Sequence, residues 1–183
     1  MPFKFTKLSI SDVVLIEPQI FQDERGFFLE NFKESDFAKN GIHTKFVQDN
    51  YSYSFKKVLR GLHFQKPPKT QAKLVTTLKG EIFDVAVDLR ENSFTYGKWV
   101  AEILSEENHS SLYIPEGFAH GFCVLSNDAN VLYKTTQDYS SEHECGIIWN
   151  DPDLNISWSF KDPILSKKDQ SLPLLKNLVV DFM

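Results

Sequence analysis

Short runs of apolar, β-branched and aromatic residues recur along the chain, and turn residues separate them. Most neighbouring runs lie about eight to twelve residues apart, which is typical of antiparallel sandwiches and barrels. Strands do not alternate with long helices, so the pattern does not favour a doubly wound parallel sheet. We predict an all-β, jelly-roll-like barrel with strands at 13–16, 26–32, 45–48, 58–65, 73–78, 81–89, 98–104, 111–114, 121–125, 130–136 and 146–149.

Helical patterns are few and short. Ser35 is a suitable N-cap for a helix through Phe37 and Ala38, which Asn40-Gly41 would end. A further turn or two is expected within 166–172. These few short helices do not change the predicted class.

Length and composition fit one domain over 1–183 with a sizeable core, because 42% of the 183 residues are hydrophobic and 16 are Phe. The formal net charge is −5 and no run of Lys or Arg occurs, so bulk charge does not favour a nucleic-acid or membrane partner. The sequence shows neither a membrane-spanning apolar stretch nor the apolar core of a signal peptide. We expect a cytoplasmic protein whose Cys123 and Cys145 are reduced thiols.

Isolated polar residues interrupt several of the apolar strands. Asp84 lies in the middle of 81–89, where an unpaired carboxylate would be costly. By strict alternation, Tyr133 shares one face of 130–136 with Val131 and Thr135. A barrel whose interior holds Asp, Lys, His and Tyr is a poor core, but it can form a pocket.

An Arg and a His lie in the otherwise apolar run 58–65. Strict alternation places Arg60 and His63 on opposite faces, so both can serve one pocket only if the strand bulges or ends there. Gly61 would permit such a bulge. Taken alone, these two residues are better explained as a buried histidine bonded to a backbone carbonyl and an arginine at the rim.

The spacing of the histidines does not favour a metal site. A facial site usually needs two nearby His and a carboxylate. The chain has no His-x-His pair, and His120 is the only other histidine in a setting like that of His63. We therefore expect no protein-bound metal.

Several longer motifs occur together and in one order, which is more specific than any one of them. In these motifs the chain resembles the dTDP-4-dehydrorhamnose 3,5-epimerase family over nearly its whole length. The resemblance implies a cupin-type jelly roll, a homodimer, and chemistry that uses no cofactor. The matching segments are DERGFF (23–28), FVQDN (46–50), VLRGLHFQ (58–65), GEIFDVAVD (80–88), IPEGFAHGF (114–122), LYKTT (132–136), WNDPD (149–153) and LSKKD (165–169).

Carried over position by position, the resemblance makes His63 the base that removes a proton from the sugar, with Asp169 as its orienting carboxylate. Tyr133 would return a proton on the opposite face, and Lys73 would stabilise the enolate. Asp84 resembles a buried polar position lining the active site. Substrate-binding positions are implied for Arg25, Glu30, Gln48, Asp49, Asn50, Arg60, Lys73, His120, Tyr139 (stacking on the thymine), Glu144 and Lys168.

The implied activity is inversion of C3 and C5 of dTDP-4-dehydro-6-deoxy-D-glucose to give dTDP-4-dehydro-L-rhamnose, for cell-surface polysaccharide biosynthesis. The 4-keto group acidifies the C–H bonds at both carbons. A base, an acid on the opposite face and a cation near the developing oxyanion therefore suffice.

Three alternatives stay open from the sequence. One is a single-centre epimerase acting on another nucleotide-linked 4-keto sugar. The others are a non-catalytic sugar-binding cupin and a metal-dependent cupin oxygenase.

Because the edges of a jelly roll invite strand exchange, we also expect a basic or N-terminal segment to cross to the partner subunit.

Overall fold

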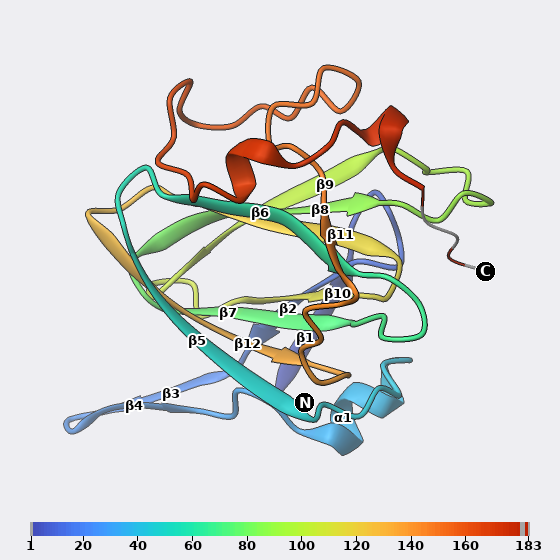
Figure 1. The fold of residues 1–183 in the computed structure, drawn as a ribbon. Helices are drawn as coiled ribbons and strands as arrows, with labels where there is room; N and C mark the ends of the chain where they lie inside the picture. The colour runs from blue at the N-terminus through green and yellow to red at the C-terminus, as the bar shows by residue number, and fades with distance from the viewer. Residues whose placement is uncertain (1, 180–181, 183) are drawn as a thin grey trace.

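In the computed structural model, which describes residues 2–179 and 182, two large β-sheets lie face to face (Figure 1). The strands are β1 (Phe3–Lys7), β2 (Val14–Pro18), β3 (Ile20–Asp23), β4 (Gly26–Leu29), β5 (Gln48–Phe55), β6 (Leu59–Gln65), β7 (Lys73–Lys79), β8 (Glu81–Asp88), β9 (Trp99–Ser105), β10 (Ser111–Ile114), β11 (Phe118–Val124), β12 (Asp128–Thr135) and β13 (Glu144–Gly146). Three short helices complete the fold: α1 (Glu34–Lys39), η1 (Asp169–Ser171) and η2 (Leu175–Asn177).

The strands form two walls and one separate hairpin. One wall has six strands in the order β1-β2-β10-β7-β12-β5, and the facing wall has five in the order β13-β6-β11-β8-β9. β3 and β4 pair only with each other, and Figure 1 shows this hairpin extending away from the barrel. The pairings between these strands are antiparallel. The predicted jelly-roll-like, mostly β architecture is confirmed.

Strand β8 shows how alternation builds two cores. Ile82 and Ala86 point into the main core between the two walls. Val85 and Val87 point to the opposite face, where side chains of the C-terminal segment (147–178) cover them. The segment crosses the five-stranded sheet (Figure 1) and brings η1 against β6. Strand β8, inside the five-stranded sheet, is therefore buried on both faces.

Helix α1 packs on the outer face of the six-stranded sheet through Phe37, whose ring meets those of Phe3 and Phe5 edge-on. The expected N-cap was wrong, because Lys33 occupies that position and Ser35 lies inside the first turn. Lys33 makes no side-chain hydrogen bond that caps the helix, so the packing of Phe37 stabilises α1 more than its N-terminal residues do. None of the helices in the described part of the chain is both long and apolar enough to traverse a bilayer.

The strand boundaries differ most at β5. The prediction ended a strand at Gln48, whereas β5 begins there. In β5 the polar side chains of Gln48, Asn50 and Ser52 line the barrel's pocket, while Tyr51 and Phe55 are exposed. Its hydrophobic pattern is therefore the reverse of an ordinary barrel strand, which is why the sequence did not reveal it. Strands β1 and β3 were not predicted either.

Candidate active site

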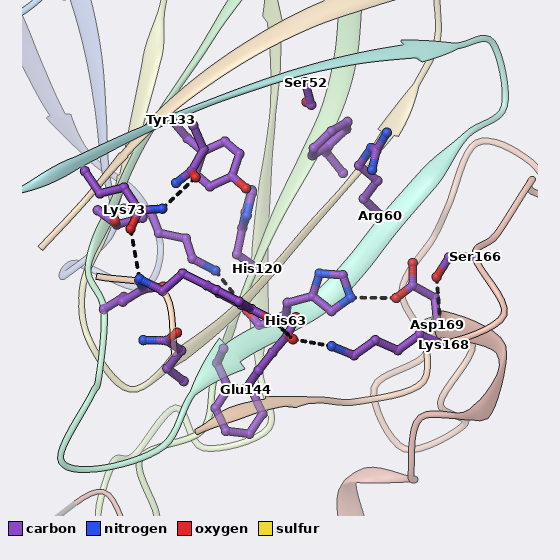
Figure 2. A pocket seen from close by; sticks show the side chains of 18 residues that line it. Ser52, Arg60, His63, Lys73, His120, Tyr133, Glu144, Ser166, Lys168 and Asp169 are labelled. Carbon is purple, nitrogen blue, oxygen red and sulfur yellow. Dashed lines mark hydrogen bonds and ion pairs between the residues drawn. The ribbon is translucent and has the colours of Figure 1, made fainter. Parts of the chain in front are cut away.

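A cavity of about 310 Å³ opens between the two walls of the barrel. Strands of both sheets and the C-terminal segment contribute to its lining (Figure 2). Most of the residues predicted for the site meet here: Gln48, Asn50, Arg60, His63, Lys73, His120, Tyr133, Tyr139, Glu144, Lys168 and Asp169.

A β-bulge in β6 brings Arg60 and His63 to the same cavity. His63 pairs with His120 on β11, but Arg60 pairs with Phe122, so β6 holds one residue more than β11 over this stretch. Gly61 permits the bulge, because its φ is +136° and a Cβ there would lie 2.5 Å from the Cα of Gly121. The strand therefore bulges where it must if Arg60 and His63 are to serve one pocket.

His63 and Asp169 form a hydrogen-bonded pair from distant parts of the sequence. The Nε2 atom of His63 lies 2.6 Å from Oδ1 of Asp169, and the Asp169 side chain is 5% exposed (Figure 2). The backbone N–H of Asp169 donates to Oγ of Ser166 at 3.0 Å, which fixes the start of η1. Burial alone would raise the pKa of Asp169, but its hydrogen bond with His63 holds that pKa below the ordinary value.

Lys73 and Tyr133 come from the opposite wall, on β7 and β12. The Lys73 side chain is buried, and its Nζ donates to the carbonyl oxygen of His63 at 3.0 Å. Burial lowers the pKa of Lys73 to about 8, against the opposing effect of nearby carboxylates. Burial also raises the pKa of Tyr133, so its phenol keeps its proton at neutral pH. The site therefore holds a cation and a neutral proton donor facing His63.

A second His–Asp pair lies beside the first. The Nε2 atom of His120 is 2.6 Å from Oδ1 of Asp84, and both side chains are buried. Burial lowers the pKa of His120 despite the neighbouring Asp84 carboxylate. Asp84 was predicted to line the site, but it lies behind His120 and is not part of the cavity wall. His120 itself does face the cavity.

At the other side of the cavity, Glu144 joins two residues of the predicted nucleotide-binding set. The hydroxyl of Tyr139 donates to Oε2 of Glu144 at 2.7 Å, and Lys168 forms an ion pair with the same oxygen. Burial would raise the pKa of Glu144, but the hydrogen bonds from Lys168 and Tyr139 lower it. Lys168 is thus already paired with an anion in the free protein.

Three predicted binding residues lie outside the cavity of this chain. Asp49 points to the outer face of β5, where its Oδ1 accepts from Nζ of Lys134 at 2.9 Å. It alternates with Gln48 and Asn50, so all three could not face one side. Arg25 lies at the tip of the β3–β4 hairpin, and Glu30 follows that hairpin.

Two cavity residues were missed although the sequence carried a signal for each. Ser52 continues the alternation of Gln48 and Asn50 along β5, and Thr135 shares its face of β12 with Tyr133. Gln65, Gln71 and Ser166 also line the cavity without such a signal. Among residues 2–179 and 182, no cluster of three or more His, Cys, Asp or Glu side chains could hold a metal ion.

Comparison with known proteins gives consistent results. A family model described as dTDP-4-dehydrorhamnose 3,5-epimerase matches residues 7–177. A protein of that name from Methanothermobacter thermautotrophicus is 51% identical over 181 residues, covering 97% of each chain. One from Shigella flexneri is 54% identical over 164 residues, covering 89% of this chain and 91% of its own. Among solved structures, the dTDP-6-deoxy-D-glucose-3,5-epimerase of Legionella pneumophila in complex with dTDP-4-keto-L-rhamnose has a TM-score of 0.94 at 47% identity, covering 97% of this chain and 95% of its own.

Proposed function

Because this chain belongs to the dTDP-4-dehydrorhamnose 3,5-epimerase family, we propose that it inverts C3 and C5 of dTDP-4-dehydro-6-deoxy-D-glucose to give dTDP-4-dehydro-L-rhamnose. One observation carries the proposal beyond similarity. The His63–Asp169 pair stands on one wall of the cavity, and Tyr133 and Lys73 stand on the other. A sugar ring between the walls would have a base on one face and an acid on the other.

His63 acts as the base in this proposal. The C–H bonds next to the 4-keto group are acidic because the electron pair left behind is delocalised onto the carbonyl oxygen. His63 takes the proton from one carbon, and the carboxylate of Asp169 stabilises the imidazolium that forms. The 2.6 Å hydrogen bond also fixes the orientation of the ring.

Lys73 and Tyr133 complete the inversion. Since the pKa of Lys73 is about 8, its side chain is charged in most molecules at pH 7 and can stabilise the enolate oxygen. The neutral phenol of Tyr133 then delivers a proton to the carbon from the opposite face, and the configuration is inverted. The same cycle repeated at the second carbon gives the doubly inverted product.

The remaining cavity residues bind the nucleotide portion. Arg60 and Lys168 are the cations available to the diphosphate, and Tyr139 offers an aromatic face to the thymine. Lys168 must exchange its carboxylate partner Glu144 for phosphate oxygens when the substrate binds. The site is thus specific for an anionic nucleotide sugar although the chain has a net charge of −5.

Exchange with solvent tests the proposed reaction directly. In D₂O the protein is expected to introduce deuterium at both C3 and C5, which NMR of the recovered sugar resolves. The variant His63→Ala should introduce label at neither carbon while still binding dTDP, whereas His43→Ala, an exposed histidine outside the cavity, should behave like the unmodified protein. Label at a single carbon would contradict the double inversion.

We further propose that the protein is a homodimer in which the β3–β4 hairpin reaches the cavity of the partner subunit. The hairpin exposes apolar side chains that favour burial, among them Phe27 at 59% and Phe28 at 66% exposure. It also carries Arg25, and Glu30 directly follows it. Both residues match substrate-binding positions of the family but lie outside the cavity of their own chain.

Mixing two inactive variants tests whether the β3–β4 hairpin acts in the cavity of the partner subunit. Subunits carrying Arg25→Ala and subunits carrying His63→Ala would be co-expressed with different tags. If Arg25 acts in the partner's cavity, each mixed dimer has one intact site, and a random mixture recovers about one quarter of the original activity. If Arg25 acts in its own chain, or the protein is a monomer, no activity beyond that of the two variants returns.

A further inference from the structure

Asp84 is a buried acidic residue that the proposed mechanism does not use. It lies in the middle of β8, between Ile82 and Ala86 on the face that packs into the main core. Its side chain is fully buried, and its Oδ1 lies 2.6 Å from Nε2 of His120. Its Oδ2 is buried with no hydrogen-bond partner among the described residues. A carboxylate held this way costs stability, so its placement calls for a functional explanation.

The groups around Asp84 indicate what that function is. Its Oδ1 meets His120, and its charge raises the pKa of Lys73, which lies on the facing wall, against the larger effect of burial. Both neighbours line the cavity, whereas Asp84 does not. Asp84 therefore supports two residues that face the substrate without reaching the substrate itself.

We propose that Asp84 is a positioning residue, whose carboxylate orients the ring of His120 and keeps Lys73 in its ammonium form inside the closed cavity. The keto sugar displaces water when it binds, and this further disfavours a buried cation. A fixed negative charge behind Lys73 offsets that effect while the enolate forms. This inference rests on the role of Lys73 in the proposed function.

The charge of Lys73 depends on groups from several strands. Asp84 faces it from β8, and Glu144 acts on it from β13. The other titratable side chains of the cavity are His63 on β6, His120 on β11, Tyr133 on β12, and Arg60, Tyr139, Lys168 and Asp169. Of the two carboxylates acting on Lys73, Glu144 is already paired with the cation of Lys168, whereas Asp84 bonds to His120 through Oδ1 only and has the larger effect on Lys73.

The variant Asp84→Asn removes the charge and keeps the shape. The amide oxygen can still accept from His120, so the histidine stays anchored. Lys73 acts as a cation, so activity falls as pH rises through its pKa, and removal of a neighbouring anion lowers that pKa. We expect the alkaline limb of kcat to move down by about one pH unit, with a loss of about tenfold at pH 8.5 and little change at pH 6.5.

Direct titration of Lys73 separates this inference from the proposed function. The side-chain NMR signal of Lys73 should titrate about one pH unit lower in Asp84→Asn than in the unmodified protein. An unchanged titration overturns the positioning role. A shifted titration with an unshifted kcat profile leaves the effect of Asp84 on Lys73 intact and shows that the reaction does not use the Lys73 cation.

A matched control distinguishes positioning from stability alone. Asp88 lies on the same strand, is equally buried, and bonds to the following loop rather than to the cavity. Asp88→Asn should lower the melting temperature without moving the alkaline limb. If Asp84→Asn also only lowers the melting temperature, the inference is wrong. Should Asp84→Asn fail to fold, Asp84→Ser provides the same comparison, since its smaller side chain also removes the charge.

Discussion

The hydrogen bond between His63 and Asp169 is the contact on which the proposed base depends, and Asp169→Asn tests it with the least change in shape. The two atoms are 2.6 Å apart, and the carboxylate is almost fully buried. A charge-assisted hydrogen bond in such a setting contributes about 1.5–3 kcal/mol, and the contribution grows as the imidazole gains a proton. We expect the barrier to rise by about 2–4 kcal/mol, which corresponds to a fall in kcat of roughly 30- to 1000-fold.

The assay measures proton exchange and binding separately. Loss of deuterium incorporation in D₂O reports the step at His63, and calorimetry with dTDP reports the nucleotide subsite. A kcat for Asp169→Asn within threefold of the original would refute the assigned pairing.

Three further perturbations follow from the structure. Gly61→Ala would place a Cβ 2.5 Å from the Cα of Gly121, so we expect a loss of more than about 2 kcal/mol in the free energy of unfolding. Gly41→Ala, which also has positive φ but meets nothing within 4 Å, should lose less. Tyr133→Phe should lower kcat by about 100-fold or more with dTDP affinity retained, and an unchanged rate would exclude the phenol as the acid. Burial would raise the pKa of Asp88, but hydrogen bonds to its carboxylate lower it to about 2. Asp88→Asn should therefore cost about 2 kcal/mol above pH 4, and this difference in denaturant unfolding should decrease as pH falls below 4 and vanish below pH 2.

The sequence predicted the barrel because its strands follow simple rules of burial. The alternation on β8 is clear, since one face packs into the main core and the other beneath the C-terminal segment. Strand β5 was not predicted because its polar side chains face the cavity and its aromatic side chains face outward. A functional cavity inverts the pattern that marks an ordinary strand, so the prediction failed where the site is.

The residues of the site were predictable chiefly through the order of the motifs. Strict alternation places Arg60 and His63 on opposite faces of β6, and only the bulge at Gly61 brings both side chains to the cavity. The partnership of His63 with Asp169 joins residues 106 positions apart, which no local pattern indicates. Arg25 lies between β3 and β4, outside the cavity of its own chain, so the pattern of these strands does not indicate its place relative to a substrate.

The C-terminal segment links the covering of the five-stranded sheet to the geometry of the site, because it also carries Asp169. His63 lies on β6, and Asp169 follows 106 positions later in η1, which packs against that strand. Loss of this segment would therefore expose Val85 and Val87 on β8 and leave His63 without its hydrogen-bond partner.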